Sequence, residues 1–169
     1  MKLEMKSIKH SAFASQETYC YEGYVYIDGK KAIYVSNDGH GGADRQYTES
    51  NFPHTTIREV DEWCKKNLPK WKMSSDYNDA EEYDTSFEMW CHNQVTKFIR
   101  RKDLKRDLNK CVIFFQDGEL MECRYKVKKL SGVHFNHFKI KNKGVKVILN
   151  EMPFEDAFKL YDEFLERVA

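Results

Sequence analysis

The sequence contains no apolar run that approaches the roughly 18 uninterrupted residues of a membrane-spanning helix. Residues 1–6 mix charged with apolar side chains and lack the continuous apolar segment of a secretory signal peptide. We therefore expect no membrane association and predict a cytoplasmic protein.

The sequence also lacks the cysteine patterns of disulfide frameworks and of most zinc sites. Its five cysteines are odd in number, and no two of them form a C-x-x-C pair. This usage indicates reduced thiols. We expect Cys64, Cys91 and Cys111 to be small buried hydrophobic residues, because they fall on apolar positions of predicted helices or strands.

A complete catalytic signature is missing as well. No Ser–His–Asp or Cys–His arrangement can be assembled from the sequence without guessing contacts. What is present is apolar mass: hydrophobic residues make up 41% and aromatic residues 14% of the 169 residues. This composition predicts one folded domain, residues 1–169, with its own core.

Charge is nearly balanced overall but unevenly distributed. The net charge is +1, yet residues 76–88 carry six acids and no Lys or Arg, while residues 124–150 carry eight Lys or Arg and no acid. Such blocks either steer an anionic partner to the second half or pair with each other, within the fold or across a homodimer. Aromatic residues among the lysines make nucleic acid a possible partner, although no nucleic-acid-binding motif is present.

Two Asp-Gly pairs between β-rich runs predict two tight hairpins. Asp28-Gly29 separates residues 19–27 from residues 32–35, and Asp117-Gly118 separates residues 111–116 from residues 120–127. Further strands are expected at residues 2–9 and 145–149.

Apolar residues at helical spacing predict three helices, beginning near Thr56, Thr85 and Pro153. Thr56 with Glu59, and Thr85 with Glu88, match the capping-box pattern. Residues 69–84 are polar and acidic and predict an exposed connection. The sequence therefore predicts an α+β fold, an antiparallel sheet of two Asp-Gly hairpins packed against about three helices.

The most unusual stretch is the glycine loop, residues 37–44. Its glycines allow a tight backbone whose N–H groups can hold an anion or a phosphate, and its acids and imidazole can bind a metal or transfer protons. Strand pairing would bring Glu17 and Thr18 to this loop, although such composition is equally typical of a plain turn. The predicted ligand-binding residues are Glu17, Thr18, Asn37, Asp38, Gly39, His40, Gly41, Gly42 and Asp44.

The run DGHGG at residues 38–42 resembles the first motif of the metal-dependent protein phosphatases, which use magnesium or manganese. The resemblance implies metal binding by Asp38 and the Gly39 carbonyl, with His40 as the acid. It covers five residues, and the later acidic motifs of that family have no counterpart here.

A second resemblance covers residues 5–165 and depends mainly on FASQET at residues 13–18 and VSNDGHGG at residues 35–42. Together these motifs resemble a group of small uncharacterised proteins encoded by bacteriophages. The resemblance implies a phage-type origin, hence a host-cytoplasmic location, and supplies no reaction. The sequence departs from the group's pattern at residues 19–21 (Tyr-Cys-Tyr).

These observations predict a binding protein without a cofactor, rather than an enzyme. Its partner would be an anionic, nucleotide-like ligand or a host protein, and the resemblance implies an inhibitory or counter-defence role. The alternative is a magnesium- or manganese-dependent hydrolase of phosphate esters, with Asp38 and Asp44 as metal ligands and His40 as acid–base.

Overall fold

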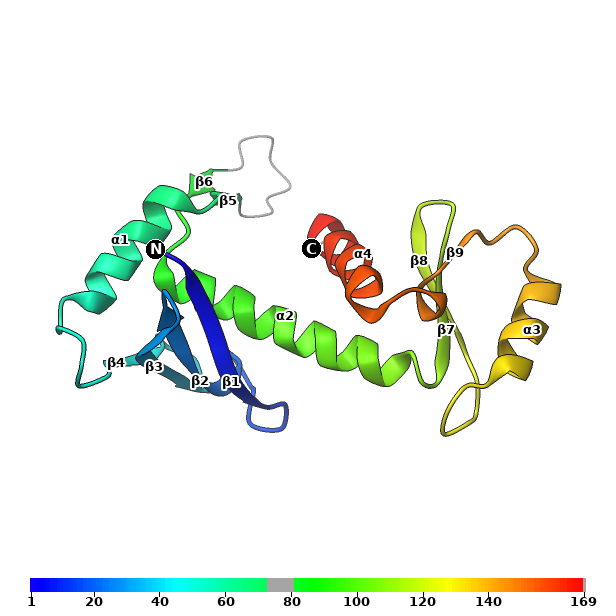
Figure 1. Cartoon of the computed structure of the whole chain (residues 1–169), viewed down its shortest axis with the longest axis horizontal. Coiled ribbons are helices and arrows are strands. Elements are labelled where there is room, and N and C mark those ends of the chain that lie inside the picture. The colour runs from blue at the N-terminus through cyan, green and yellow to red at the C-terminus, as the bar shows by residue number, and fades with distance from the viewer. Residues whose placement is uncertain (73–80, 169) are drawn as a thin grey trace. The chain divides into compact units, whose positions relative to one another are not determined.

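The computed structural model describes residues 1–72 and 81–168, and within these the α+β prediction is confirmed. The described residues form four α-helices, one short 3-10 helix and three antiparallel sheets. None of the described helices has the length and apolarity needed to cross a bilayer. The chain divides into two compact units, Met1–Phe98 and Ile99–Ala169, which we describe separately (Figure 1).

A four-stranded antiparallel sheet is the centre of the first unit. Its strands follow chain order: β1 (Leu3–Ser11), β2 (Cys20–Ile27), β3 (Lys30–Asp38) and β4 (Arg45–Thr48). Asp28 and Gly29 both have positive φ, 48° and 82°, so they form the two-residue turn that the sequence predicts between β2 and β3.

Side chains of the sheet alternate between a buried and a partly exposed face. Two helices complete the unit's core: α1 (Thr56–Asn67) and the first part of α2 (Phe87–Asp107). Cys64 and Cys91 are fully buried there, as predicted. Buried residues of this core include Val25, Ile33, Val35, Val60, Cys64, Phe87, Trp90, Cys91 and Val95.

The other face of the sheet carries a row of tyrosines across three strands. The rings of Tyr24 and Tyr34 lie 5.2 Å apart between centroids, and those of Tyr34 and Tyr47 lie 6.4 Å apart. The Lys31 ammonium lies 3.5 Å from the Tyr24 ring centroid. Tyr24 and Tyr34 are partly exposed and Tyr47 is exposed, so this face remains open within the unit.

The helix starts differ from the two predicted capping boxes. Thr56 is buried in the first turn of α1, and the N-cap, Thr55, forms no side-chain cap, so the first capping box is wrong. At α2, the Ser86 hydroxyl accepts from the Met89 amide at 3.1 Å, so Ser86 is the cap in place of Thr85. Glu88 is thereby left to reach a different partner, the glycine loop.

The predicted acidic connection, residues 69–84, is described only at its ends. Strands β5 (Trp71–Lys72) and β6 (Glu82–Tyr83) pair antiparallel there, and the Trp71 and Tyr83 rings stack 5.1 Å apart. The central part of this prediction, residues 73–80, lies outside the described residues.

The second unit contains a three-stranded antiparallel sheet in the order β8-β7-β9. Its strands are β7 (Cys111–Gln116), β8 (Glu119–Arg124) and β9 (Val147–Ile148). The turn at Asp117-Gly118 has positive φ at both residues, 53° and 86°. The two Asp-Gly hairpins thus form as predicted. They belong to separate sheets, so the prediction of one sheet built from both hairpins is wrong.

Helices pack around this second sheet. These are α3 (Gly132–Lys141), the 3-10 helix η1 (Leu149–Glu151) and α4 (Phe154–Val168). Phe138 of α3 packs on Phe114 of β7, with ring centroids 4.8 Å apart. Helix α3 is an element that the three predicted helices did not include.

Candidate functional site

Asn37 is the centre of the glycine loop. Its Oδ1 accepts hydrogen bonds from the Thr18 hydroxyl at 2.7 Å and from the Gly39 amide at 2.9 Å. Its Nδ2 donates to the Gly42 carbonyl and to Asp44 Oδ1, both at 3.1 Å. Because an amide side chain offers two donors and two acceptor positions, this buried Asn37 is fully used.

Gly39 joins the glycine loop to the loop between β1 and β2. Its carbonyl accepts from the amides of Gln16 at 2.9 Å, Glu17 at 3.0 Å and Thr18 at 3.4 Å. A Cβ at this position would lie 2.2 Å from the Ala14 carbonyl oxygen, and φ is +86°. Only glycine satisfies both conditions.

The predicted approach of Glu17 and Thr18 to the glycine loop is therefore present in the structure. The Gly41 amide also donates to the Thr18 hydroxyl, at 3.3 Å. The Glu17 carboxylate lies against Gly41, where an added Cβ would be 2.5 Å from its Oε2. We call residues 12–19 and 39–44 together the loop pair.

Ser15 stiffens the first half of the loop pair. Its hydroxyl donates to the Ser11 carbonyl and accepts from the Cys20 amide, both at 2.8 Å. The His10 ring nitrogen Nε2 lies 3.2 Å from the same hydroxyl. Both ends of this loop are thus tied to one side chain.

Asp44 ends the glycine loop in a partly buried position. Its carboxylate accepts from the Tyr21 hydroxyl and from Asn37, and its own amide donates to Glu88 Oε1 of α2 at 2.8 Å. Burial raises the pKa of the Asp44 carboxyl, and burial also raises the pKa of the Tyr21 hydroxyl. The contact with Glu88 joins the loop to a residue 44 positions along the chain.

Asp38 and His40 lie on the exposed side of the glycine loop. The Asp38 carboxylate accepts from the His40 amide at 3.4 Å and from the Arg45 guanidinium at 2.7 Å. The His40 amide and then the Arg45 charge hold the pKa of Asp38 below its usual value. The His40 ring Nδ1 lies 3.6 Å from the same carboxylate.

This geometry bears on the expected anion pocket. The amides of Gly39, His40, Gly41 and Asp44 all donate to side chains of the protein itself. An anion bound to these groups would have to displace Asn37, Asp38, Thr18 or Glu88. Gly39 and Gly41 allow the close contact between the two loops, whereas an added Cβ at Gly42 would meet no atom within 4 Å.

The two predicted metal ligands have separate partners. Asp38 pairs with Arg45, whereas Asp44 bonds to Tyr21 and Asn37. Across residues 1–72 and 81–168, no group of three or more His, Cys, Asp or Glu side chains is placed to hold a metal ion.

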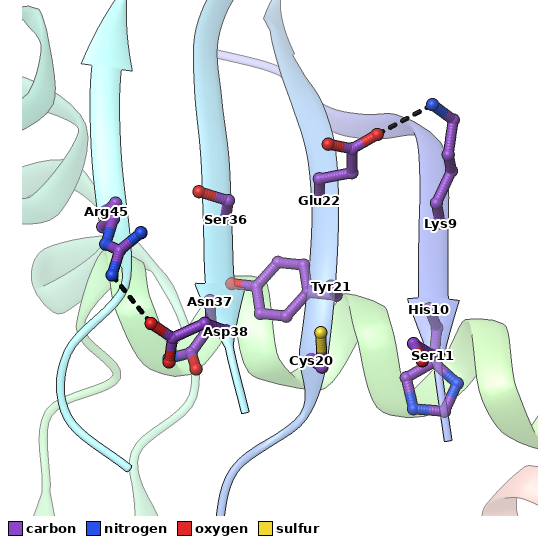
Figure 2. A pocket seen from close by; sticks show the side chains of 10 residues that line it. All are labelled: Lys9, His10, Ser11, Cys20, Tyr21, Glu22, Ser36, Asn37, Asp38 and Arg45. Atoms are coloured by element: carbon purple, nitrogen blue, oxygen red, sulfur yellow. Dashed lines mark hydrogen bonds and ion pairs between the residues drawn. The ribbon is translucent and has the colours of Figure 1, made fainter. Parts of the chain in front are cut away.

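A groove of about 360 Å³ lies beside the loop pair, on strand ends of the four-stranded sheet (Figure 2). Two ion pairs lie along it, Lys9–Glu22 at 2.7 Å and Arg45–Asp38 at 2.7 Å. Ten residues line the groove: Lys9, His10, Ser11, Cys20, Tyr21, Glu22, Ser36, Asn37, Asp38 and Arg45.

Sequence reasoning identified Asn37 and Asp38 of this groove and missed its cations. The strand register explains the omission, because Lys9 faces Glu22 across β1 and β2, and Arg45 faces Ser36 across β3 and β4. A sequence does not specify such cross-strand neighbours until the register is known.

The loop pair also displays one large apolar side chain. Phe13 has 99% of its surface exposed, on a loop whose backbone is bonded to Gly39 and Ser15. This residue begins the FASQET motif, so the signal was present in the sequence, but nothing in its pattern indicated exposure.

Comparison of the chain with known protein families, with curated proteins and with solved structures finds no match.

Proposed function

We propose that the chain is a binding protein that captures a partner protein through the loop pair, with Phe13 as the apolar anchor. The supporting observation is the 99% exposure of Phe13 on a loop held by hydrogen bonds at both ends. Burying a phenylalanine side chain is worth roughly 1.5–3 kcal/mol. A partner with an apolar pocket would recover this free energy on binding.

Rigidity makes this anchor effective. Three amides donate to the Gly39 carbonyl, and Asn37 accepts hydrogen bonds from Thr18 in one loop and Gly39 in the other. The loop pair therefore keeps its shape without a ligand. A preorganised loop loses little conformational entropy on binding, and aromatic anchors commonly dominate interface energetics. The resemblance to phage-encoded proteins favours a host protein, such as a defence component, as the partner.

The test compares two single-residue variants in the full chain. Phe13→Ser removes the anchor, and Val133→Ser removes an apolar side chain that is 76% exposed in the second unit. Both proteins should fold normally, because neither side chain is buried. The three proteins are incubated with a lysate of the cells in which the chain is naturally produced, and the captured proteins are quantified by mass spectrometry. We expect wild type and Val133→Ser to retain the partner and Phe13→Ser to lose it.

Once the partner is purified, the dissociation constants of wild type and variants measure how much Phe13 contributes to binding. Removal of a hot-spot side chain costs 2 kcal/mol or more, so the dissociation constant should rise by about 30-fold or more for Phe13→Ser. Equal capture by wild type and both variants would contradict the proposal.

The groove favours a second candidate, capture of a nucleotide-like anion. Its volume of about 360 Å³ lies within the range of small-molecule sites, and Lys9 and Arg45 supply cations. Calorimetric titration with nucleotides should then show heat that Arg45→Ala abolishes. Titration with Mg²⁺ and Mn²⁺, combined with a generic phosphate-ester assay, tests the hydrolase alternative, which fails if neither heat nor turnover appears.

A further inference from the structure

The second unit contains a long cationic segment. Residues 124–150 include eight Lys or Arg and no Asp or Glu. The segment runs from the end of β8 through α3 to the start of η1. This concentration of positive charge lies outside the loop pair, so the proposed function does not account for it.

Most of these cations have no carboxylate partner among the described residues. Arg124 pairs with Glu122 at 3.3 Å, and Lys139 pairs with Glu151. For the other six, the part of the chain that the structure describes supplies no ion pair. These six exposed lysines are Lys126, Lys128, Lys129, Lys141, Lys143 and Lys146.

The six lysines form two groups at the two ends of α3. Lys126, Lys128 and Lys129 precede the helix, and Lys141, Lys143 and Lys146 lie at its end and beyond. The second group lines a groove of about 460 Å³ beside the tip of the β7–β8 hairpin, together with one carboxylate, that of Asp117. Nine helical residues, 132–140, lie between the groups and span about 14 Å, a distance comparable with the width of a DNA groove.

The aromatic residues of the segment are used in the core. Phe138 is 2% exposed, and Tyr125 and Phe135 pack against the same core cluster. Unpaired bases are usually held by exposed aromatic rings, and none of the Tyr or Phe rings of this segment, which the structure describes in full, is exposed. The cations, in contrast, suit the phosphates of a duplex, whose bases are already stacked.

We propose that the Ile99–Ala169 unit binds duplex nucleic acid through the phosphate backbone, using the six lysines and no base-specific contact. This inference does not depend on Phe13 or on the loop pair. With about six phosphates neutralised, the logarithm of the binding constant should fall against the logarithm of salt concentration with a slope of about −5.

The experiment measures fluorescence anisotropy of a labelled duplex with the full chain, between about 50 and 200 mM salt. The test variant is Lys141→Glu/Lys143→Glu/Lys146→Glu. The control, Lys102→Glu/Lys105→Glu/Lys159→Glu, makes the same change in net charge at exposed lysines of α2 and α4. Thermal unfolding checks that both variants remain folded.

The proposal expects the test variant to lose affinity by about 100-fold or more at low salt and to lower the slope by about 3, with less than about 5-fold loss in the control. Three results would overturn it. These are absence of binding by the wild type, equal losses in both variants, and tighter binding of a single strand of the same sequence.

A fourth result would assign the segment to a different partner. Val133 and Ile140 are 76% and 70% exposed on α3, and exposed apolar residues among lysines also suit an anionic bilayer. Binding to phosphatidylserine-containing vesicles that Val133→Ser/Ile140→Ser abolishes, with no binding to the duplex, would replace the proposal.

Discussion

The open face of the first unit and residues 124–150 of the second unit differ in how their surface charges are paired. On the open face of the first unit, cations and acids are paired across strands, for example Lys9 with Glu22 at 2.7 Å and Lys31 with Glu49 at 3.1 Å. In the second unit, residues 124–150 hold eight cations and no acid. Exposed ion pairs contribute little to stability, so the difference acts mainly on the electric field around each unit. This contrast agrees with the two proposals, capture through an apolar anchor in the first unit and binding through charge in the second.

The two units also share a feature: each contains one asparagine whose side chain makes at least three hydrogen bonds. Asn37 connects the two halves of the loop pair in the first unit. Asn150 accepts from the Ile113 amide at 2.8 Å and donates to the carbonyls of Leu108 and Cys111 at 2.9 Å each. The first asparagine fixes a displayed loop, and the second joins the end of α2 to β7.

Replacing these asparagines is expected to have the largest effect on the free energy of unfolding. Asn37→Ala removes the acceptor of the Thr18 hydroxyl proton and of the Gly39 amide, and the side-chain donor to the Gly42 carbonyl. We therefore expect a loss of about 3 kcal/mol in the free energy of unfolding. Asn150→Ala removes three bonds at a less buried position, and about 2 kcal/mol is expected. Urea denaturation measures both losses.

Capture of the partner protein distinguishes the two asparagines further. Asn37→Ala should weaken capture, because the loop pair is then no longer held, while Asn150→Ala should not. Equal effects on capture would contradict the division of roles between the units.

The second expected effect compares two glycines of the same loop. An alanine at Gly39 would place Cβ 2.2 Å from the Ala14 carbonyl, whereas at Gly42 no atom lies within 4 Å. Both positions have positive φ, +86° and +87°. Gly42→Ala should therefore cost about 1 kcal/mol from backbone conformation alone. Gly39→Ala should cost about 2 kcal/mol or more, because the two loops must also move apart.

This pair of variants separates the energetic cost of the close contact at Gly39 from the cost of a positive φ at a residue with a side chain. Thermal or chemical unfolding gives the two losses, and hydrogen exchange of the Gln16 and Glu17 amides reports whether the loops have parted. If Gly39→Ala and Gly42→Ala were equally stable, the close approach of Gly39 to Ala14 would have no energetic importance.

Local sequence signals predicted much of the fold. The hairpins at Asp28-Gly29 and Asp117-Gly118 formed as predicted because their turns depend on two adjacent residues. Helix α3 was missed because Val133 and Ile140 face solvent while Phe138 faces the core, so its apolar residues form no single stripe. Strand β4 was missed because its four residues include little apolar character.

The site was predictable to the extent that it depends on strand pairing. Cys20 pairs with Asp38, which brings the preceding Glu17 and Thr18 next to the glycine loop, as expected. The acceptors of the loop amides were not predictable, because one of them, Glu88, comes from α2 and was assigned to a capping box. Long-range hydrogen bonds of this kind depend on tertiary packing, which the sequence pattern does not specify.

A smaller effect concerns Asp44 and pH. Burial raises the pKa of this carboxyl in the folded state above its ordinary value of 3.8. The protonated form is therefore favoured by folding, and its contribution is complete below the unfolded pKa and lost as pH rises through the folded pKa. Relative to Asp44→Asn, the wild type should gain stability as pH falls from neutral toward 4.

The difference between the two unfolding free energies, measured across this pH range, isolates Asp44 from the other acids. Tyr21→Phe provides a second control, because it removes the hydroxyl that donates to Asp44. A difference that stays constant with pH, or that changes in the opposite direction, would show that Asp44 is ionised as readily in the folded protein as in the unfolded chain.

The smallest expected effect is a change in the free energy of unfolding when a surface lysine is removed, and its sign tests the charge comparison. Lys9→Ala removes the partner of Glu22 and should lower stability at low salt, whereas Lys143→Ala relieves repulsion among unpaired lysines and should raise it. Both changes should shrink at high salt, because screening weakens attraction and repulsion alike. Denaturation of the two variants at low and high salt gives the comparison. Two changes of the same sign would mean that Lys9 and Lys143 experience similar surroundings. Opposite signs that vanish together at high salt would confirm that the charge of Lys9 is neutralised by its partner and that the charge of Lys143 is not.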